Sequence, residues 1–195
     1  FYGMSSLTSL DVSNFNTSSA TLMFGMFAEL HSLQSLDLSN FDTSKVTRMD
    51  SMFINCRKLI SLNISSFDTA NVTDMKEMFK EVSKLSVLDV SSFNTKSVNS
   101  MQHMFFGMRA LTELNLSNFN TSSVSGWGMY GMFGSMESLK NLDIGHFDTS
   151  NITVMDYMFN FCHNLVSINL AGFNTSKVTS MKSMFAGTDL LQNLD

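Results

Sequence analysis

The sequence predicts an α/β repeat solenoid, in which each repeat contributes one short strand and one short helix. Three observations predict this fold. A phenylalanine recurs at a nearly constant interval, apolar residues alternate with polar ones just before it, and apolar residues recur at helical spacing after it. One interval, from Phe119 to Phe147, is two residues longer than the others. The series is Phe15, Phe41, Phe67, Phe93, Phe119, Phe147 and Phe173.

The strand is predicted from the residues before each phenylalanine. Leu36 and Leu38 flank Asp37, which is the alternation of a strand with one buried face. Because successive repeats run in the same direction, their strands should form a parallel sheet with ~4.8 Å between neighbours. Eight such strands would span roughly 34 Å.

The helix is predicted from the residues after each phenylalanine. Val46, Met49, Met52 and Phe53 fall at i, i+3, i+6 and i+7, which is one face of a helix. The three residues before this face, 42–44, are Asp, Thr and Ser, and each can cap a helix N-terminus. The sequence leaves open which of them does so.

The frame covers the whole chain and predicts a single solenoid domain, 1–195, of about seven repeats with a two-residue insertion near 124–133. Each repeat offers about nine apolar side chains, worth roughly 2 kcal/mol apiece when buried. Ordering its backbone costs on the order of 1–2 kcal/mol per residue, so only stacked repeats are stable. The chain starts at Phe1 and stops at Asp195 within repeats, and we expect a segment of a longer protein with capping repeats elsewhere.

The frame from Leu33 to Phe53, with its Phe-Asp-Thr-Ser and Met-x-x-Met-Phe elements, resembles the 26-residue repeat of bacterial surface proteins. That repeat belongs to the BspA-like branch of leucine-rich-repeat proteins. The resemblance implies a leucine-rich-repeat-like solenoid with a parallel sheet on one face and helices on the other. It also implies a bacterial cell-surface or extracellular location, often as a lipoprotein, and a role in adhesion.

Composition argues against several classes of function. The chain has 12 Lys and Arg against 17 Asp and Glu, without a basic cluster, which is unlike a nucleic-acid-binding protein. No apolar stretch approaches the ~18 residues that span a bilayer, so membrane insertion by this segment is not expected. The oligomeric state is left open.

Residues capable of catalysis are scattered, and we expect no enzymatic activity, cofactor or metal. Cys56 and Cys162 share one repeat position four copies apart, roughly 20 Å by strand spacing, and other copies fill that position mostly with apolar residues. They are therefore predicted to be free core cysteines. The four histidines occupy different copies, and no nucleophile–base set can be assembled from them.

Asx residues recur at the outward strand position, and two explanations remain open. Hydrogen bonds between neighbouring side chains account for the pattern, while an acidic ladder could hold Ca²⁺. A second Asx set, just after the recurring phenylalanine, is predicted to supply turn and cap chemistry. The outward set is Asp11, Asp37, Asn63, Asp89, Asn115, Asp143, Asn169 and Asp195.

The fifth repeat departs from the frame. Its insertion brings Gly126, Gly128 and Gly131 into the predicted helix, which should shorten or bulge it. Trp127, the single Trp, and Tyr130 lie among these glycines and are residue types favoured as binding anchors. The alternative is a neutral insertion in which Trp127 folds back onto the solenoid.

The sequence favours a non-enzymatic array that binds an extracellular protein or glycan through many weak, repeated contacts. Outward strand positions are small and polar, without the aromatic residues expected of a single strong protein–protein anchor, and those near the aberrant fifth repeat are the first targets for mutagenesis. The alternative is a rigid spacer that presents another domain. Candidate ligand contacts are Glu113, Asn115, Trp127, Tyr130, Lys140, Asn141 and Asp143.

Overall fold

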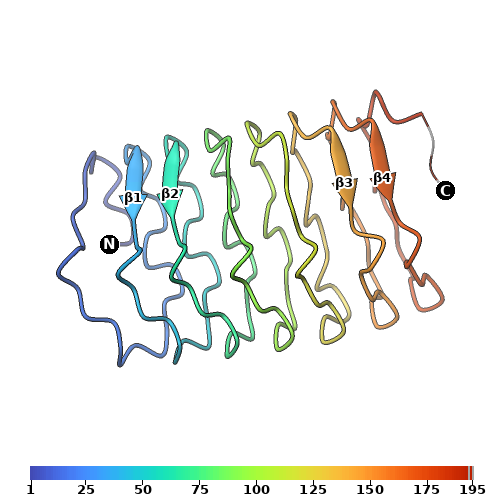
Figure 1. Cartoon of the computed structure of the whole chain (residues 1–195). Coiled ribbons are helices and arrows are strands. Elements are labelled where there is room, and N and C mark those ends of the chain that lie inside the picture. The colour runs from blue at the N-terminus through green and yellow to red at the C-terminus, as the bar shows by residue number, and fades with distance from the viewer. Residues whose placement is uncertain (193, 195) are drawn as a thin grey trace.

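The computed structural model describes residues 1–192 and 194. The chain winds into successive coils that stack side by side along one axis, with the N-terminus at one end and the C-terminus at the other (Figure 1). Each coil corresponds to one repeat, so equivalent positions of successive repeats lie next to each other. Inward methionines such as Met49 and Met52 are fully buried, which confirms that the methionine side faces the core from the second to the sixth repeat; the equivalent Met181 of the last repeat is 45% exposed.

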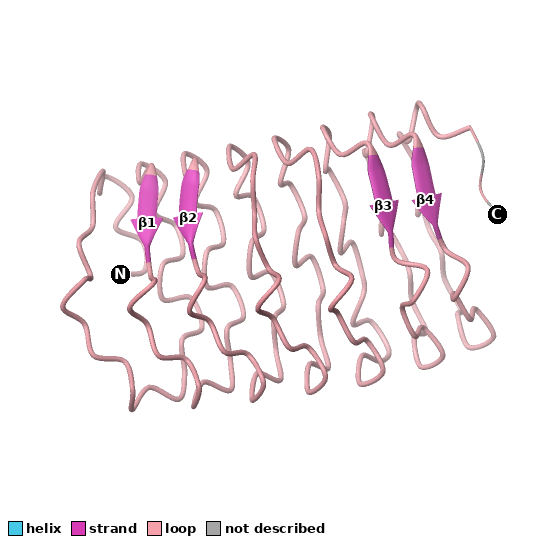
Figure 2. Ribbon diagram, in the orientation of Figure 1, coloured by secondary structure: helices cyan, strands magenta, loops and turns pink. Residues whose placement is uncertain are grey.

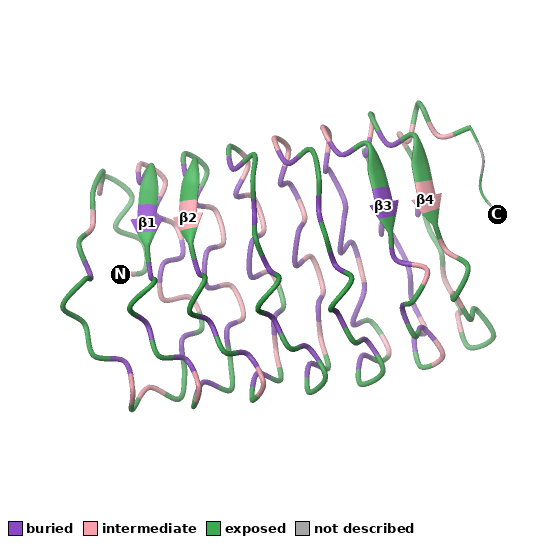
Figure 3. Ribbon diagram, viewed as in Figure 1, coloured by how far each residue is buried: buried purple, intermediate pink, exposed green. Residues whose placement is uncertain are grey.

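Four short strands lie along one side of the array, which we call the strand column. β1 (Ser35–Asp37) pairs in parallel with β2 (Ser61–Asn63), and β3 (Asn141–Asp143) pairs in parallel with β4 (Ser167–Asn169). Each residue pairs with its equivalent in the next repeat, so that Leu36 lies opposite Leu62 and Leu142 opposite Ile168. Burial alternates as predicted, with Leu36 buried between exposed Ser35 and Asp37 (Figure 3).

The expectation of one continuous sheet is wrong. Residues 87–89 and 113–115 occupy strand positions but form no strand (Figure 2). Both segments are described, and no backbone hydrogen bond joins them to each other or to the flanking strands. Predicted strand residues 193 and 195 lie outside the described residues.

The predicted helices are also wrong: the described part of the chain contains none (Figure 2). The Met-x-x-Met-Phe segments form a second column, the Met column, which spans residues 49–55 in the second repeat. Ser51 and Asn55 there have positive φ angles of 56° and 61°, which a right-handed helix excludes. Positive φ recurs at both positions in neighbouring repeats, for example at Glu77 and Glu81.

Hydrogen bonding in the Met column joins repeats instead of closing helical turns. The N–H groups of Met49, Ser51, Phe53 and Asn55 donate to carbonyls of the third repeat, at 2.8–3.1 Å. N–H groups between them, such as that of Met52, donate three residues back within the same repeat. Backbone N–H groups along the Met column therefore alternate between a bond to the next repeat and a bond within the turn of their own repeat.

The spacing of the repeats explains why helices do not fit. Equivalent Phe53, Phe79 and Phe105 rings stack with centroids 5.6 and 5.9 Å apart. Packed α-helices need axes about 8–10 Å apart, so helices on successive repeats would collide at this separation. A chain that turns repeatedly can bury residues at i, i+3 and i+4 as a helix does, which is why the apolar spacing was ambiguous.

A buried threonine ladder replaces the predicted caps. The Thr43 hydroxyl donates to the carbonyl of Asp68 and accepts the N–H of the same residue, both at 2.8 Å. Asp42 accepts the N–H of Ser44 at 3.0 Å, which is an Asx turn. The turn role of the second Asx set is thus confirmed, whereas the cap role is wrong because there is no helix. The same threonine pairing recurs at Thr17, Thr69, Thr95 and Thr149.

Candidate ligand-binding site

The strand column opens in its middle. No backbone hydrogen bond joins residues 113–116 to the strand positions of either neighbouring repeat, all of which are described. The equivalent residues of β1 and β2 are joined, for instance by the N–H of Leu38 and the carbonyl of Asn63 at 2.9 Å. The inward side chain of Leu114 is nevertheless only 8% exposed, so the core stays covered beneath the opening.

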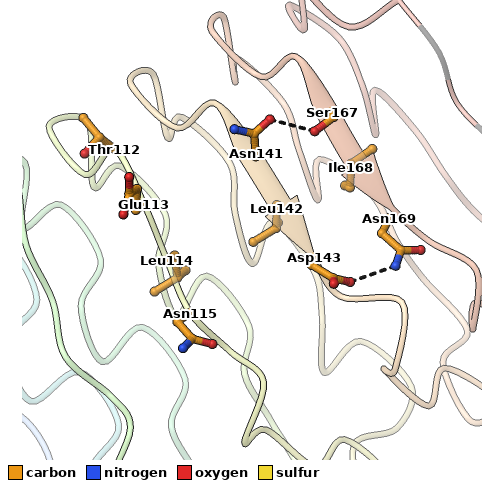
Figure 4. Close-up of a pocket in the computed structure, with 10 residues that line it drawn as sticks. All are labelled: Thr112, Glu113, Leu114, Asn115, Asn141, Leu142, Asp143, Ser167, Ile168 and Asn169. Carbon is orange, nitrogen blue, oxygen red and sulfur yellow. Dashed lines mark hydrogen bonds between the residues drawn. The ribbon is translucent and has the colours of Figure 1, made fainter.

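A shallow hollow of about 560 Å³ lies over this opening and extends to β4 (Figure 4). Its floor is apolar and its rim carries hydroxyl, amide and carboxylate groups. Ten residues line it: Thr112, Glu113, Leu114, Asn115, Asn141, Leu142, Asp143, Ser167, Ile168 and Asn169.

Part of the rim is ordered by bonds between neighbouring repeats. The Ser167 hydroxyl donates to Asn141 Oδ1 at 2.7 Å, and Asn169 Nδ2 donates to Asp143 Oδ1 at 2.9 Å (Figure 4). The predicted hydrogen bonding between outward side chains of neighbouring repeats is thus confirmed for β3 and β4. The side-chain nitrogens of Asn115 and Asn141 have no partner within the described part of the chain, so they are free to meet a ligand.

Four of the seven residues predicted as ligand contacts line the hollow: Glu113, Asn115, Asn141 and Asp143. Lys140 is exposed beside Asn141, and its carbonyl accepts the N–H of Val166 at 2.8 Å. The structure therefore brings five of the predicted residues to one region of one face. Ser167 and Asn169, which were not among the predicted ligand contacts, complete the hollow because they lie one repeat after Asn141 and Asp143.

Trp127 and Tyr130 lie on the Met column, away from the hollow, and belong to an aromatic cluster. Their rings stack with centroids 5.7 Å apart, and Tyr130 also meets Tyr157 at 5.6 Å and His103 at 5.0 Å. Lys182 Nζ lies 5.7 Å from the Tyr157 ring centroid. Trp127 is 57% exposed, so it packs against the solenoid on one side and reaches solvent on the other.

The glycines of the fifth repeat make room for this cluster. A Cβ atom on Gly131 would lie 2.5 Å from the His103 ring, and one on Gly134 would lie 2.7 Å from the Phe106 ring. Gly126 and Gly131 also have positive φ angles of 59° and 57°. No helix exists there to be shortened or bulged, and the glycines instead accommodate aromatic side chains of the fourth repeat.

Both cysteines occupy the core, as predicted. Cys56 is 1% exposed and Cys162 is fully buried, and the two thiols donate to the carbonyls of Phe27 and Phe133 at 3.0 and 3.1 Å. Burial raises the pKa of Cys56 to about 12 and that of Cys162 to about 11. Thiols of this kind are poor nucleophiles and poor metal ligands near neutral pH.

Two other kinds of site are not found in the described residues. Within residues 1–192 and 194, no three His, Cys, Asp or Glu side chains gather where they could bind one metal ion. The same residues include no helix with the length and apolar character needed to cross a bilayer.

Two solved structures resemble the chain in fold. A leucine-rich repeat protein from Bacteroides ovatus ATCC 8483 shares 18% identity with a TM-score of 0.41; the match covers 76% of this chain and 40% of that protein. A leucine-rich cell surface protein from Faecalibacterium prausnitzii A2-165 shares 16% identity with a TM-score of 0.31; coverage is 99% of this chain and 74% of that protein. At these scores neither likeness carries a functional argument. The chain spans less than half the length of the Bacteroides protein.

No curated protein matches the chain. A family model, in contrast, matches residues 1–88 and 83–195, which together take in the whole chain. The chain therefore belongs to the family described as "Mycoplasma protein of unknown function, DUF285".

Proposed function

We propose that this chain is a non-enzymatic segment of a bacterial cell-surface protein that binds extracellular protein or glycan ligands through its strand column. The observation that supports this most directly is the hollow over β3 and β4. It offers an apolar floor, free amide groups and carboxylates on a solvent-exposed face. A site of this kind suits a ligand that lies across several repeats.

The repeat architecture favours binding by avidity. Each coil presents a similar row of polar side chains, and a rigid array holds these rows at fixed distances. Several weak contacts made together raise the effective concentration at each site without one strong anchor. The surface location and the adhesive role rest on the resemblance of the repeat frame to BspA-like surface proteins.

Binding rather than catalysis is proposed because neither the thiols nor the paired histidines reach the hollow. The two thiols are buried in the core, with pKa values raised to about 12 and about 11. His31 pairs with Glu29 and His163 with Asp189, each at 2.7 Å, near opposite ends of the array. Neither pair lines the hollow.

The alternative function is a rigid spacer. Its support is the Met column, where backbone hydrogen bonds continue from repeat to repeat, together with the stacked phenylalanine rings. A stiff rod needs no ligand of its own, and small residues such as Ser9, Ser35 and Ser61 on the strand column are compatible with that role.

One substitution pair separates these functions. Ser167→Trp places a large side chain in the hollow, whereas Ser35→Trp places the same side chain at the equivalent position of β1. The chain and both variants would be tested on immobilised mucin and extracellular-matrix proteins, with circular dichroism to verify folding. We expect binding by the unmodified chain and by Ser35→Trp, and at least a tenfold loss with Ser167→Trp.

Equal binding by the two variants would contradict the hollow as the binding site. If the unmodified chain binds none of these surfaces, the spacer becomes the better description.

A further inference from the structure

Charge is distributed unevenly between the faces of the solenoid. We define the strand face as the exposed residues at the two outward strand positions and at the position before each strand. Six of the 17 acidic residues have these positions in the sequence, five of them in the described part of the chain, against one of the 12 basic residues, Lys140. The described strand face therefore carries a formal charge of −4, five acidic residues against one basic, out of the −5 of the whole chain.

Five of the six acidic residues are described, and all five are exposed: Asp11, Asp37, Asp89, Glu113 and Asp143. The sixth, Asp195, lies outside the described residues. Asp89, Glu113 and Asp143 stand in consecutive repeats, and the last two line the hollow. Lys58 and Lys84 lie in the turns that precede two of the strand positions.

Local hydrogen bonds keep carboxylates on this face ionised. Side-chain and backbone hydrogen bonds from Ser91 lower the pKa of Asp89. Backbone and side-chain hydrogen bonds from Ser39 lower the pKa of Asp37 in the same way. The face is therefore negative throughout the physiological pH range.

We infer that the strand face binds a cationic, extended polypeptide segment whose Lys or Arg side chains meet Asp89, Glu113 and Asp143. This inference rests on the proposed function and narrows its ligand class. Sulfated and sialylated glycans are anionic and would be repelled by these carboxylates. Neutral glycans could donate hydroxyl hydrogen bonds to the carboxylates, but they carry no charge to complement the negative face. A basic peptide gains from both the charge and the free amide groups of Asn115 and Asn141.

The dimensions also suit a peptide that lies along the solenoid axis. Alternate side chains of an extended peptide recur every ~6.6 Å. Equivalent core rings, such as Phe79, Phe105, Phe133 and Phe159, recur every 5.7–5.9 Å. A peptide in this direction therefore passes successive repeats at nearly the spacing of its alternate side chains. Asp89 and Asp143 occupy the second outward strand position and Glu113 the first, so the basic side chains would face acidic residues in two adjacent rows.

The test uses the full chain and a peptide of about ten residues that alternates Lys and Ser. Heparin and dextran serve as the anionic and neutral glycan probes. We expect the peptide to bind, and its affinity to fall steeply between about 0.1 M and about 1 M salt, where the Debye length shrinks from about 10 Å to about 3 Å.

Two triple variants distinguish an effect of the strand-face carboxylates from an effect of the net charge of the whole chain. The first is Asp89→Asn, Glu113→Gln and Asp143→Asn. The matched control is Asp42→Asn, Asp68→Asn and Asp148→Asn, which removes three negative charges from turns outside the strand face. Both triples move the formal net charge from −5 to −2 and keep the side-chain oxygens that accept backbone N–H groups. Exposed ion pairs contribute modestly, so we expect the first triple to weaken peptide binding by about 3- to 10-fold and the control by less than twofold.

The outcomes distinguish the inference from the proposed function. Equal weakening by both triples would mean that only net charge matters and would overturn the inference. Absence of peptide binding would also overturn it. If dextran or heparin bound instead and Ser167→Trp abolished that binding, the proposed function would stand without the cationic ligand. If none of the three probes bound, and Ser167→Trp left binding to mucin and matrix proteins unchanged, the inference and the proposed function would both be wrong.

Discussion

The strand column and the Met column are built from the same repeats, yet they are held together differently. In the strand column, backbone pairing joins β1 to β2 and β3 to β4 and is missing at the first, fourth and fifth repeats. In the Met column, bonds continue across those same repeats, for example from Phe79 N–H to Met104 carbonyl at 3.0 Å and from Phe105 N–H to Met132 carbonyl at 3.0 Å. The Met column therefore maintains the stacking where pairing in the strand column is interrupted.

Side chains strengthen this division. The buried phenylalanine and threonine ladders run between the two columns and repeat the same contacts at nearly every step. Stability should then be sensitive to substitutions in the ladders and the Met column, and insensitive to those on the strand face. Four predictions test this contrast, from the largest expected effect to the smallest.

Phe79→Ala should have the largest effect. The Phe79 side chain is fully buried and its ring lies 5.6 Å from Phe53 and 5.9 Å from Phe105. Its removal should lower the free energy of unfolding by about 3–5 kcal/mol, measured by urea denaturation. Val87→Ala is the control on the strand face, where the side chain is 76% exposed, and it should change the free energy by less than about 0.5 kcal/mol. Comparable losses would show that both columns maintain the stacking.

Thr95→Val should have the next largest effect. The Thr95 hydroxyl donates to the carbonyl of Asn120 and accepts its N–H, both at 2.8 Å, and the side chain is 1% exposed. Valine keeps the shape but leaves two backbone groups unpaired, which should cost about 2 kcal/mol. The exposed Thr73 makes one hydroxyl bond, to the Thr47 carbonyl at 3.2 Å, so Thr73→Val should cost about 0.5 kcal/mol. If the two variants unfold at the same urea concentration, the threonine ladder does not stabilise the stack.

Gly131→Ala tests the crowded part of the Met column. Its φ of 57° already costs an alanine about 1–2 kcal/mol, and the added Cβ would meet the His103 ring at 2.5 Å. Gly126→Ala has a similar φ of 59° with nothing within 4 Å, so it isolates the backbone cost. We expect Gly131→Ala to be the more destabilising and to shift the fluorescence of Trp127, which contacts His103 through Tyr130. Unchanged fluorescence in Gly131→Ala would show that the rings of this cluster are not coupled.

Much of the fold could be predicted from the sequence, because repeat period and burial pattern are properties of single residues. The solenoid, the inward leucines around Asp37 and the core position of Cys56 follow from residue type and spacing. Residue type and spacing could not decide between a helix and a series of turns after each phenylalanine, because the i, i+3, i+6, i+7 spacing of Val46 to Phe53 fits both. Distance between repeats decides between them, and it depends on the stacked rings of several repeats at once.

The hollow was predicted only in part for a similar reason. Glu113, Asn115, Asn141 and Asp143 stood out because they lie beside the aberrant fifth repeat. Ser167 and Asn169 lie further along the chain, and only the parallel register of β3 and β4 brings them to the same place. The aromatic neighbours of Trp127 were missed because His103 belongs to the preceding repeat and Tyr157 to the following one.

The smallest expected effect per residue concerns the buried thiols, which lie directly after the Met column. Burial raises the pKa of Cys56 and Cys162 above the ordinary value of 9.0, to about 12 and about 11. A raised folded-state pKa stabilises the fold below the unfolded pKa, and this contribution is lost as pH rises. Above about pH 9 the unfolded chain ionises first, so each thiol should cost about 1 kcal/mol of stability by about pH 10. The variant with Cys56→Ala and Cys162→Ala lacks this effect, so its stability should decline less between pH 8 and pH 10 in urea titrations. A parallel decline in both proteins, or rapid thiol labelling of the native chain at pH 8, would show that the segment after the Met column opens to solvent.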